Sequence, residues 1–227
     1  MIKLLITYIS YLKHKALNLY RLNQLIYRGV KFTSIGTVAI EGNVIVGDNV
    51  CIGSNVVLRG DVTISDGVII GDNCHIENTR IGKNTNIKSS SILDKSDIGL
   101  GTIVGPFARI RPNSKIMDNV QVGTFVEIKN STVGSLCKVN HLAFLGDAVL
   151  EEGVIIGAGS VTCNWDGKQT RETLIEKNAF IGSGVYLVAP LRVGQDSIIG
   201  AGSVITKDVD ALKMTIARSD QINIKDL

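Results

Sequence analysis

Aliphatic residues recur at every sixth position along most of this chain, each with a small residue two positions before it. The stepping begins near Ile40, shortens once to five residues at Ile81, and runs from Ile98 to Ile128. After a break it resumes at Ile175 and ends at Ile205. The small residues include Val50, Val62, Cys74, Thr102, Ala108, Ser114, Cys137, Ala143, Val154 and Ser203.

This spacing predicts a solenoid. Two inward positions separated by two residues fit a short strand, because side chains alternate between the faces of a strand. The next residue is often Gly or Asn, which tolerate a positive φ, so the chain turns there. Three such sides make a triangular coil of about 18 residues, and coils stack at the strand spacing of ~4.8 Å. The fold class is therefore all-β, a parallel β-helix. An α-helical period of 3.6 residues and short hairpin turns are both missing.

The N-terminal segment follows a different pattern. Apolar residues there have the three-four spacing of an amphipathic helix or helical pair, interrupted at Asn23. They are Ile2, Leu5, Ile9, Leu12, Ala16, Leu19 and Ile26. We expect a basic helical segment at 1–34, the β-helix at 35–206 with an inserted loop at 164–174, and a tail at 207–227.

Composition and charge agree with this division. The 227 residues are 44% hydrophobic but only 5% aromatic, and 24 are glycine, which suits a repetitive backbone. Residues 1–40 contain six Lys or Arg and no Asp or Glu, whereas the remainder has 18 basic and 21 acidic residues. No apolar run approaches the ~20 residues of a membrane span. The four cysteines form no CxxC pair, and Cys74 and Cys137 fall on inward positions. We expect a cytoplasmic protein whose thiols are reduced and fill the core.

Function must then lie on outward positions. Arg111 and Lys129 each follow an inward aliphatic residue and are 18 residues apart, so they should stack at one corner of adjacent coils. Two cations ~5 Å apart repel unless an anion such as phosphate bridges them. The alternative is a pair of solvated surface cations. Glu127 precedes Ile128 and His141 follows Val139 by two residues, and we expect both to point outward.

Zinc is the competing chemistry for histidines on a solenoid, and it needs about three converging ligands. His75 and His141 are separated by more than three coils, on the order of 17 Å, so no metal is expected. The repeat breaks at a polar loop that begins with Asn164 and carries the only tryptophan, Trp165. An exposed Trp165 would contact a neighbouring chain or a ligand; alternatively, it packs on its own solenoid wall.

Several motifs together resemble one family. They are GPFARIRPNSKIMDNVQVGTFVEIKNSTVGS, NHLAFLGDA, IIGAGSVTCNWDG, FIGSGVYLVAPLRVG and IGAGSVITKDV. The match runs from about Ile98 to Arg218 and is similar to the acetyltransferase domain of a bacterial bifunctional enzyme. That enzyme acetylates glucosamine-1-phosphate and uridylylates the product. The family consists of hexapeptide-repeat acyltransferases, so the resemblance implies a left-handed β-helix. Some 40 residues precede the repeat, too few for the uridylyltransferase half.

The resemblance implies a role for each matching residue. His141 matches the general base, Glu127 a carboxylate near it, and Asn164 a residue that contacts acceptor and acetyl group. Arg111 and Lys129 match the phosphate clamp. The acetyl-CoA contacts are matched by Ala158, Ser183, Ala201 and Arg218. The family works as a homotrimer with active sites between chains, which would explain an outward histidine.

The acceptor side departs from the family. Phe144 and Trp165 each stand where the family has Tyr, Ile155 where it has Asn, and Thr170 where it has Lys. Three of these changes remove a polar group, and such losses alter specificity more than fold. We therefore expect acetyl-CoA-dependent N-acetylation of a phosphorylated or nucleotide-linked amino sugar in surface glycan or cell-envelope precursor synthesis. The partner would be a small sugar, with no nucleic acid.

Three alternatives stay open. The chain would otherwise be a sugar O-acetyltransferase, the glucosamine-1-phosphate enzyme itself, or a non-catalytic solenoid scaffold. The basic N-terminal segment, residues 1–31, would suit weak contact with an anionic membrane surface. We favour instead its packing at the solenoid end or along a trimer axis.

Overall fold

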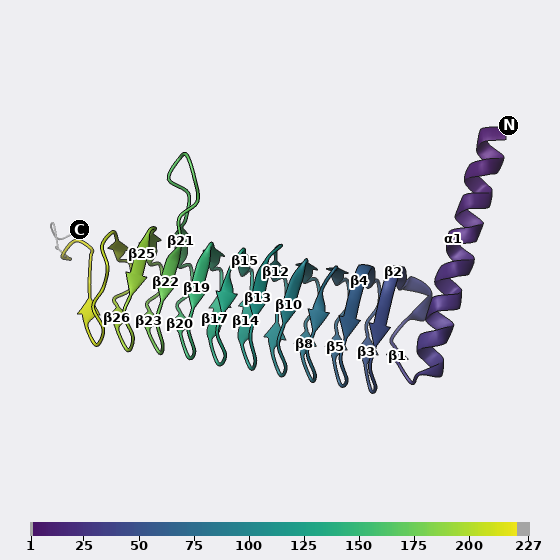
Figure 1. The fold of residues 1–227 in the computed structure, drawn as a ribbon, viewed down its shortest axis with the longest axis horizontal. Coiled ribbons are helices and arrows are strands. Elements are labelled where there is room, and N and C mark those ends of the chain that lie inside the picture. Colours follow the sequence, from purple (N-terminus) through teal and green to yellow (C-terminus); the bar gives the residue numbers. More distant parts are fainter. Residues whose placement is uncertain (1, 222–227) are drawn as a thin grey trace, which may run out of the picture.

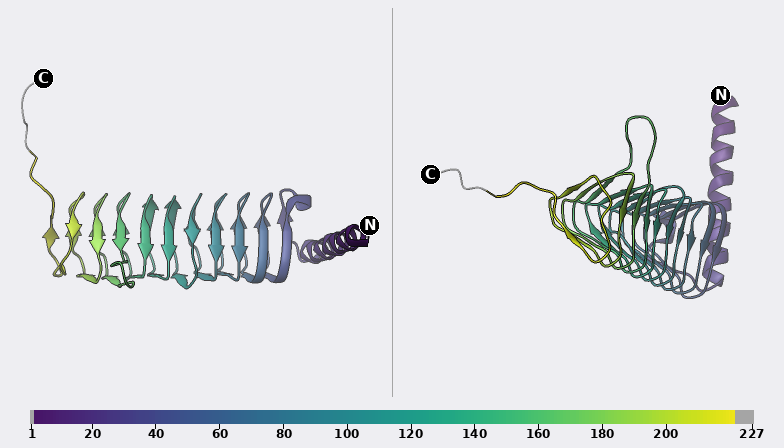
Figure 2. Two further views of the ribbon diagram at one scale, coloured as in Figure 1. Left: turned by 90° about the horizontal axis from the view of Figure 1, so that it is seen from above. Right: turned by 60° about the vertical axis from the view of Figure 1, so that its left-hand side comes forward.

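The computed structural model describes residues 2–221, with side chains from residue 6 onward. The side chains of Ile2 and Leu5 in the predicted apolar stripe, and residues 222–227 of the predicted tail, therefore lie outside the described part. A single helix, α1 (Ile2–Tyr27), precedes a long parallel β-solenoid (Figure 1). Viewed towards one end, the coils have a triangular outline (Figure 2). The predicted all-β solenoid is confirmed, and its hexapeptide repeats fit the left-handed form.

The first side of the triangle is an 11-stranded parallel sheet. Its strands are β1 (Lys31–Phe32), β3 (Cys51–Ile52), β5 (Ile69–Ile70), β8 (Asn86–Ile87), β11 (Ile103–Val104), β14 (Gln121–Thr124), β17 (Lys138–His141), β20 (Ile155–Ile156), β23 (Phe180–Ile181), β26 (Ile198–Ile199) and β28 (Met214–Thr215).

The other two sides form a 17-stranded sheet, because β2 (Ala39–Val46) and β4 (Val57–Ile64) continue around the corner between them. The second side also contains β6 (His75–Glu77), β9 (Ile92–Asp94), β12 (Arg109–Ile110), β15 (Glu127–Lys129), β18 (Phe144–Gly146), β21 (Val161–Cys163), β24 (Tyr186–Val188) and β27 (Val204–Ile205). The third contains β7 (Arg80–Ile81), β10 (Ser96–Ile98), β13 (Ser114–Ile116), β16 (Thr132–Val133), β19 (Ala148–Leu150), β22 (Thr173–Ile175) and β25 (Leu191–Val193). A short 3₁₀ turn, η1 (Ile35–Thr37), precedes β2.

The core is a stack of aliphatic side chains along the solenoid axis. Ile52, Ile76, Ile110 and Ile128 are fully buried, as their place in the repeat predicts. Many of the small inward positions accept a hydroxyl or thiol group because a backbone carbonyl lies within hydrogen-bonding distance, although Ser91, Thr173 and Ser197 have no such partner for their hydroxyls. Thr102 Oγ1, for example, donates to the carbonyl of Met117 at 2.8 Å.

The buried cysteines belong to this core. All four cysteines are free thiols, and Cys137 Sγ donates to the carbonyl of Glu151 at 3.0 Å. Burial raises the pKa of the Cys137 thiol to about 11 and also raises the pKa of Cys74. A thiol that stays protonated at neutral pH is a weak nucleophile, which fits the predicted packing role.

The predicted break in the repeat is shorter than the sequence indicated. Val133, Val139, Leu145 and Leu150 are all buried, so the coils continue through this region up to Cys163. The repeat was hidden because several sides have five residues rather than six, and the register between coils is then 17, as between Glu127 and Phe144. Only the loop at 164–172 leaves the solenoid.

Helix α1 is continuous through Asn23, which is exposed, so a helical pair is not formed. The helix ends in a Schellman motif: Gly29 has φ 83°, its N–H bonds to the carbonyl of Ile26, and that of Val30 bonds to the carbonyl of Leu25. Leu22 and Leu25 are buried against the first coil, whereas the N-terminal half projects from the solenoid (Figure 1).

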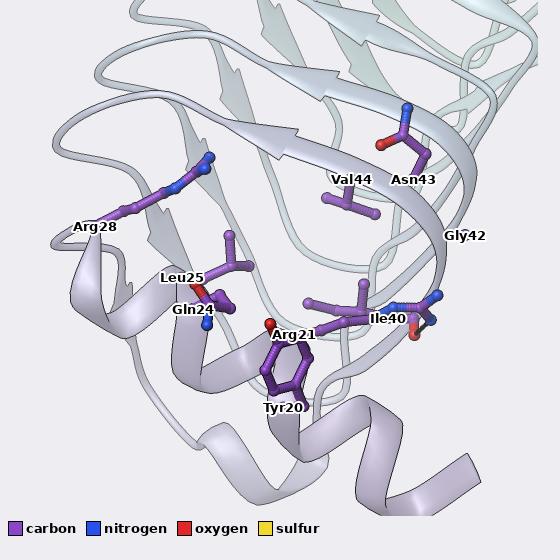
Figure 3. Close-up of a pocket in the computed structure, with 9 residues that line it drawn as sticks. All are labelled: Tyr20, Arg21, Gln24, Leu25, Arg28, Ile40, Gly42, Asn43 and Val44. Carbon is purple, nitrogen blue, oxygen red and sulfur yellow. Dashed lines mark hydrogen bonds between the residues drawn. The ribbon is translucent and has the colours of Figure 1, made fainter. Parts of the chain in front are cut away.

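The helix also covers the edge of the first coil. Asn18 donates to the carbonyl of Val38 at 2.9 Å and accepts from the N–H of Ile40 at 2.7 Å. Arg21 donates to the carbonyl of Ile40 at 2.8 Å. A pocket of about 250 Å³ remains between helix and coil, with Arg21 and Leu25 on one wall and Ile40 on the other (Figure 3). Side chains thus pair backbone groups that would otherwise be open at a sheet edge.

Candidate functional site

Four of the predicted site residues lie together on the second side of the solenoid. Glu127 and Lys129 flank the buried Ile128 on β15, and Arg111 follows β12 on the preceding coil. The register pairs Arg109 with Glu127 and Ile110 with Ile128, so Arg111 and Lys129 are neighbours on adjacent coils. Phe144 pairs with Glu127 on the next coil. The stacking predicted from the 18-residue spacing is therefore present.

Each of the two cations has its own carboxylate. Arg111 Nη1 lies 2.8 Å from Glu127 Oε1, and Lys129 Nζ lies 3.9 Å from Asp147 Oδ2. Both cationic side chains are about one-third exposed. The repulsion expected between Arg111 and Lys129 is thus balanced within the chain, so the spacing alone does not require an anion.

Asp147 is a residue that the sequence analysis missed. Its side chain is 11% exposed and accepts hydrogen bonds from the amides of both Asn130 and Asn164, beside Lys129. Asn164 is nearly buried at the base of the inserted loop, where Asp147 fixes its amide. The sequence feature that could have identified Asp147 is the Gly-Asp pair at the corner after β18. A carboxylate at this corner can accept a hydrogen bond from the buried amide of Asn164.

His141 lies at the end of β17, at the corner between the first and second sides, and its side chain is exposed. Its carbonyl accepts from the N–H of Gly159 on the next coil. Among residues 2–221 the imidazole has no hydrogen-bond partner, and Glu127 pairs with Arg111 instead. The structure therefore does not join Glu127 to His141 within one chain.

A strip without bulky side chains begins beside His141. Ala158, Ser183 and Ala201 follow it at the same corner on successive coils, linked by backbone bonds from Gly159, Gly184 and Gly202 to the preceding coil. These three glycines have φ between 65° and 73°, and a Cβ on Gly159 or Gly184 would meet no atom within 4 Å. A Cβ on Gly202 would lie 3.7 Å from Cδ of Arg218. The four residues predicted to contact acetyl-CoA thus line one surface.

The same corner is apolar on the other side of His141. Phe107, Phe125 and Leu142 occupy the position that becomes glycine in the later coils, and all three have φ near 55° and are more than half exposed. The rings of Phe107 and Phe125 stack with centroids 5.4 Å apart. Bulky residues rarely adopt this conformation. An exposed apolar column held in it indicates a contact surface.

The inserted loop stands away from the solenoid as a small hairpin (Figure 1). Trp165 and Thr170 form an antiparallel bridge, and the Asp166 carboxylate accepts from the N–H groups of Lys168 and Gln169. These bonds, with that from Arg171, hold the pKa of Asp166 below its ordinary value. The Trp165 side chain is 60% exposed and therefore does not pack on the solenoid wall.

Not all predicted acceptor residues meet in one chain. Ile155 is on β20, on the first side of the triangle, whereas Phe144 is on the second. Trp165 and Thr170 are on the hairpin. Within residues 2–221 no three His, Cys, Asp or Glu side chains are grouped as metal ligands would be.

These features define a class. The chain is a parallel β-helix in which a strip of small residues runs along one corner beside an exposed histidine. Residues 172–207 match the family model described as bacterial transferase hexapeptide (six repeats), and residues 40–114 match that of the GMPPB C-terminal domain.

Comparison with individual proteins narrows the resemblance further than the family models do. Over 123 residues, 54% of this chain, it is 53% identical to the bifunctional protein GlmU of Carboxydothermus hydrogenoformans. Over 127 residues it is 46% identical to the bifunctional protein GlmU of Herminiimonas arsenicoxydans. The matched part is 28% of either relative's length. The resemblance to this bifunctional enzyme is thereby confirmed.

Solved structures support the fold. The UDP-N-acetylglucosamine acyltransferase of Arabidopsis superposes with a TM-score of 0.64 at 15% identity, covering 79% of this chain and 69% of that one. No helix within residues 2–221 has the length and apolar character needed to cross a membrane.

Proposed function

We propose that this protein is an acetyl-CoA-dependent N-acetyltransferase whose acceptor is an amino sugar that carries phosphate. The observation that supports this most is the continuity of the corner: exposed His141 is followed by the bare strip at Ala158, Ser183 and Ala201, ending at Arg218. A long, thin thioester would lie along the strip with its acetyl group at His141.

The reaction would proceed by direct transfer. The acceptor amine attacks the thioester carbonyl, a C–N bond forms, and the C–S bond breaks. His141 takes a proton from the amine and returns it to the departing sulfur. Asn164, fixed by Asp147, would donate to the carbonyl oxygen as charge develops there. Binding of an acceptor phosphate to Arg111 would release Glu127 from its ion pair, leaving that carboxylate free to orient His141.

We further propose a homotrimer whose sites lie between chains. The apolar column of Phe107, Phe125 and Leu142 needs a cover. Phe144 and Ile155 lie on different sides of the triangle, so one site receives both only if it draws them from two chains. A projecting hairpin with an exposed Trp165 would reach a neighbour's site.

The experiment that tests the function is calorimetry with acetyl-CoA followed by an assay against phosphorylated and nucleotide-linked amino sugars. If the protein binds acetyl-CoA but acetylates none of the amino sugars, sugar O-acetylation becomes the better explanation, with His141 deprotonating a hydroxyl. The assay would then be repeated with sugars that offer a hydroxyl group as the acceptor. Failure to bind acetyl-CoA would instead support a scaffold.

The clamp makes a separate prediction. Lys129→Ala should raise KM for a phosphorylated acceptor about tenfold or more and leave KM for acetyl-CoA unchanged, because a charge-assisted contact is lost on the acceptor only. Lys115→Ala is the matched control, since Lys115 is an exposed cation on the third side. Equal effects on both substrates would place Lys129 at the coenzyme.

We propose that the free half of α1 rests on an anionic lipid surface. Ile6, Ile9 and Leu12 are 44 to 61% exposed on the helix, and no acidic residue precedes Glu41. Packing three such helices together would bring like charges into contact, whereas anionic lipid would complement them. The packing of Leu22 and Leu25 at the solenoid end is compatible with this contact.

The test is co-sedimentation with phosphatidylserine and phosphatidylcholine vesicles. We expect binding to the anionic vesicles only, and a loss of about fivefold for each of Lys13→Gln and Lys15→Gln. Leu12→Asp should abolish it, and Lys177→Gln, in the solenoid beyond β22, should not. Equal binding to both lipids, or an altered oligomeric state in Leu12→Asp, would contradict the proposal and indicate contact between chains.

A further inference from the structure

A second hollow continues the candidate site along the solenoid, away from His141. It has a volume of about 220 Å³ and lies between β6, β9 and β12. Arg111 belongs both to this hollow and to the pair with Lys129. Across the hollow the register runs from His75 to Ile92 to Arg109, a span of two spacings or about 10 Å, and one further spacing leads to Glu127 in the candidate site. That length exceeds what a single sugar phosphate needs.

Along this face of the solenoid, one column of side chains is positively charged at the end nearer His141 and negatively charged at the other end. Lys129 and Arg111 occupy one column, and Asp94 and Glu77 continue it on the next two coils. Arg109 lies two residues before Arg111, and its exposed guanidinium makes no ion pair or hydrogen bond with the described residues 2–221. Three cations therefore cluster where the site would hold phosphate, which is one more than a bridged monophosphate uses.

The carboxylate end contains an unpaired acceptor. Asp94 lines the hollow, and its Oδ1 atom is buried without a hydrogen-bond partner. A buried oxygen without a donor is unfavourable, so this position suits a ligand that brings a hydroxyl or N–H group. Glu77 is held only loosely, with Oε2 3.8 Å from His75 Nε2. Beside them, the exposed Ile92 and the ring of His75 offer a surface on which a flat base would stack.

We propose that this hollow binds the nucleoside diphosphate portion of a nucleotide-linked amino sugar. The diphosphate lies on Arg109 and Arg111, the ribose hydroxyls donate to Asp94 and Glu77, and the base covers Ile92. The sugar then reaches Phe144 with its amine at His141. This inference rests on the proposed acetyl transfer, and it selects the nucleotide-linked acceptor over a simple sugar phosphate.

The test is direct binding to the full-length protein, measured by calorimetry with UDP, GDP, CDP and dTDP, and with inorganic pyrophosphate as the comparison. We expect one nucleoside diphosphate to bind at least tenfold more tightly than pyrophosphate. Arg109→Gln should weaken both ligands about tenfold. Asp94→Asn should weaken the nucleoside diphosphate by a similar factor without weakening pyrophosphate, because a neutral amide oxygen replaces the charged carboxylate as the acceptor for the ribose, whereas the loss of a negative charge does not disfavour pyrophosphate. Arg80→Gln, an exposed and ion-paired arginine on the third side, is the matched control.

Pyrophosphate binding as tightly as every nucleoside diphosphate would overturn the assignment of ribose and base. Wild-type affinity in both Arg109→Gln and Asp94→Asn, with unchanged melting temperatures, would place the nucleotide elsewhere. Either result leaves acetyl-CoA binding and turnover intact and so refutes this inference alone. Loss of acetyl-CoA binding in the wild-type protein would refute the proposed function itself.

Discussion

His141→Ala should reduce kcat by ~10²–10⁴-fold while the melting temperature and the oligomeric state stay as in the wild-type protein. The imidazole is exposed at a corner and makes no hydrogen bond within residues 2–221, so its removal takes little from the stability of the fold. The loss would come from the proton that the attacking amine can no longer release.

The measurement is steady-state kinetics with acetyl-CoA and the best acceptor from the sugar panel, alongside thermal unfolding. His14→Ala is the matched control, because His14 is an exposed histidine on α1 whose ring bonds only to the Ser10 carbonyl. A near-normal rate in His141→Ala, or its unfolding, would disprove the role assigned to His141.

Glucosamine-1-phosphate should be a poor acceptor, with a specificity constant at least a hundredfold below that of the best nucleotide-linked amino sugar. Phe144, Ile155 and Thr170 cannot offer the phenol, amide and ammonium groups that the family resemblance leads us to expect at these three positions. Each missing hydrogen bond costs on the order of 0.5–1.5 kcal/mol, and more when the ligand's polar group is left buried and unpaired. Trp165 would compensate for a larger acceptor only, by stacking on its sugar or base.

The assay compares kcat/KM across glucosamine-1-phosphate and several nucleotide-linked amino sugars. Restoring the polar groups together, as Phe144→Tyr with Ile155→Asn, should raise kcat/KM for glucosamine-1-phosphate, whereas Ile69→Asn, an exposed position on the same sheet but far from Ile155, should not. Ordinary efficiency with glucosamine-1-phosphate as the best acceptor would refute the inference from the altered residues.

The solenoid was predictable because its inward positions obey a strict rule that leaves a period in the sequence. Val50, Ile52, Cys74 and Ile76 are all buried as that rule requires. Between Ile128 and Cys163 the six-residue step is lost from the sequence, because sides of five residues shift the phase without changing the packing, but the small residues Cys137, Ala143 and Val154 still mark the inward positions there. Of the two alternatives predicted for the N-terminal segment, the single helix is present and the helical pair is not, because a single exposed Asn23 costs little in a helix.

From the sequence, only those parts of the site that depend on the register between coils could be predicted. Arg111 and Lys129 are neighbours because one full coil separates them. Their partners Glu127 and Asp147 depend on side-chain rotamers and on a corner residue, neither of which a repeat encodes. The replacement of Phe107, Phe125 and Leu142 by glycine at the same corner was visible in the sequence, but its meaning required knowing that these positions form one line.

The bonds that Asn18 and Arg21 make to Val38 and Ile40 have a consequence for how chains assemble. A solenoid is a one-dimensional stack, and an open first coil is a template on which another molecule's last coil would add. By covering that edge, α1 terminates the stack at its N-terminal end and prevents end-to-end polymerisation into fibres. The homotrimer that we propose would then form sideways, along the face where the apolar column lies, and such an assembly closes at a finite number of chains instead of growing without limit.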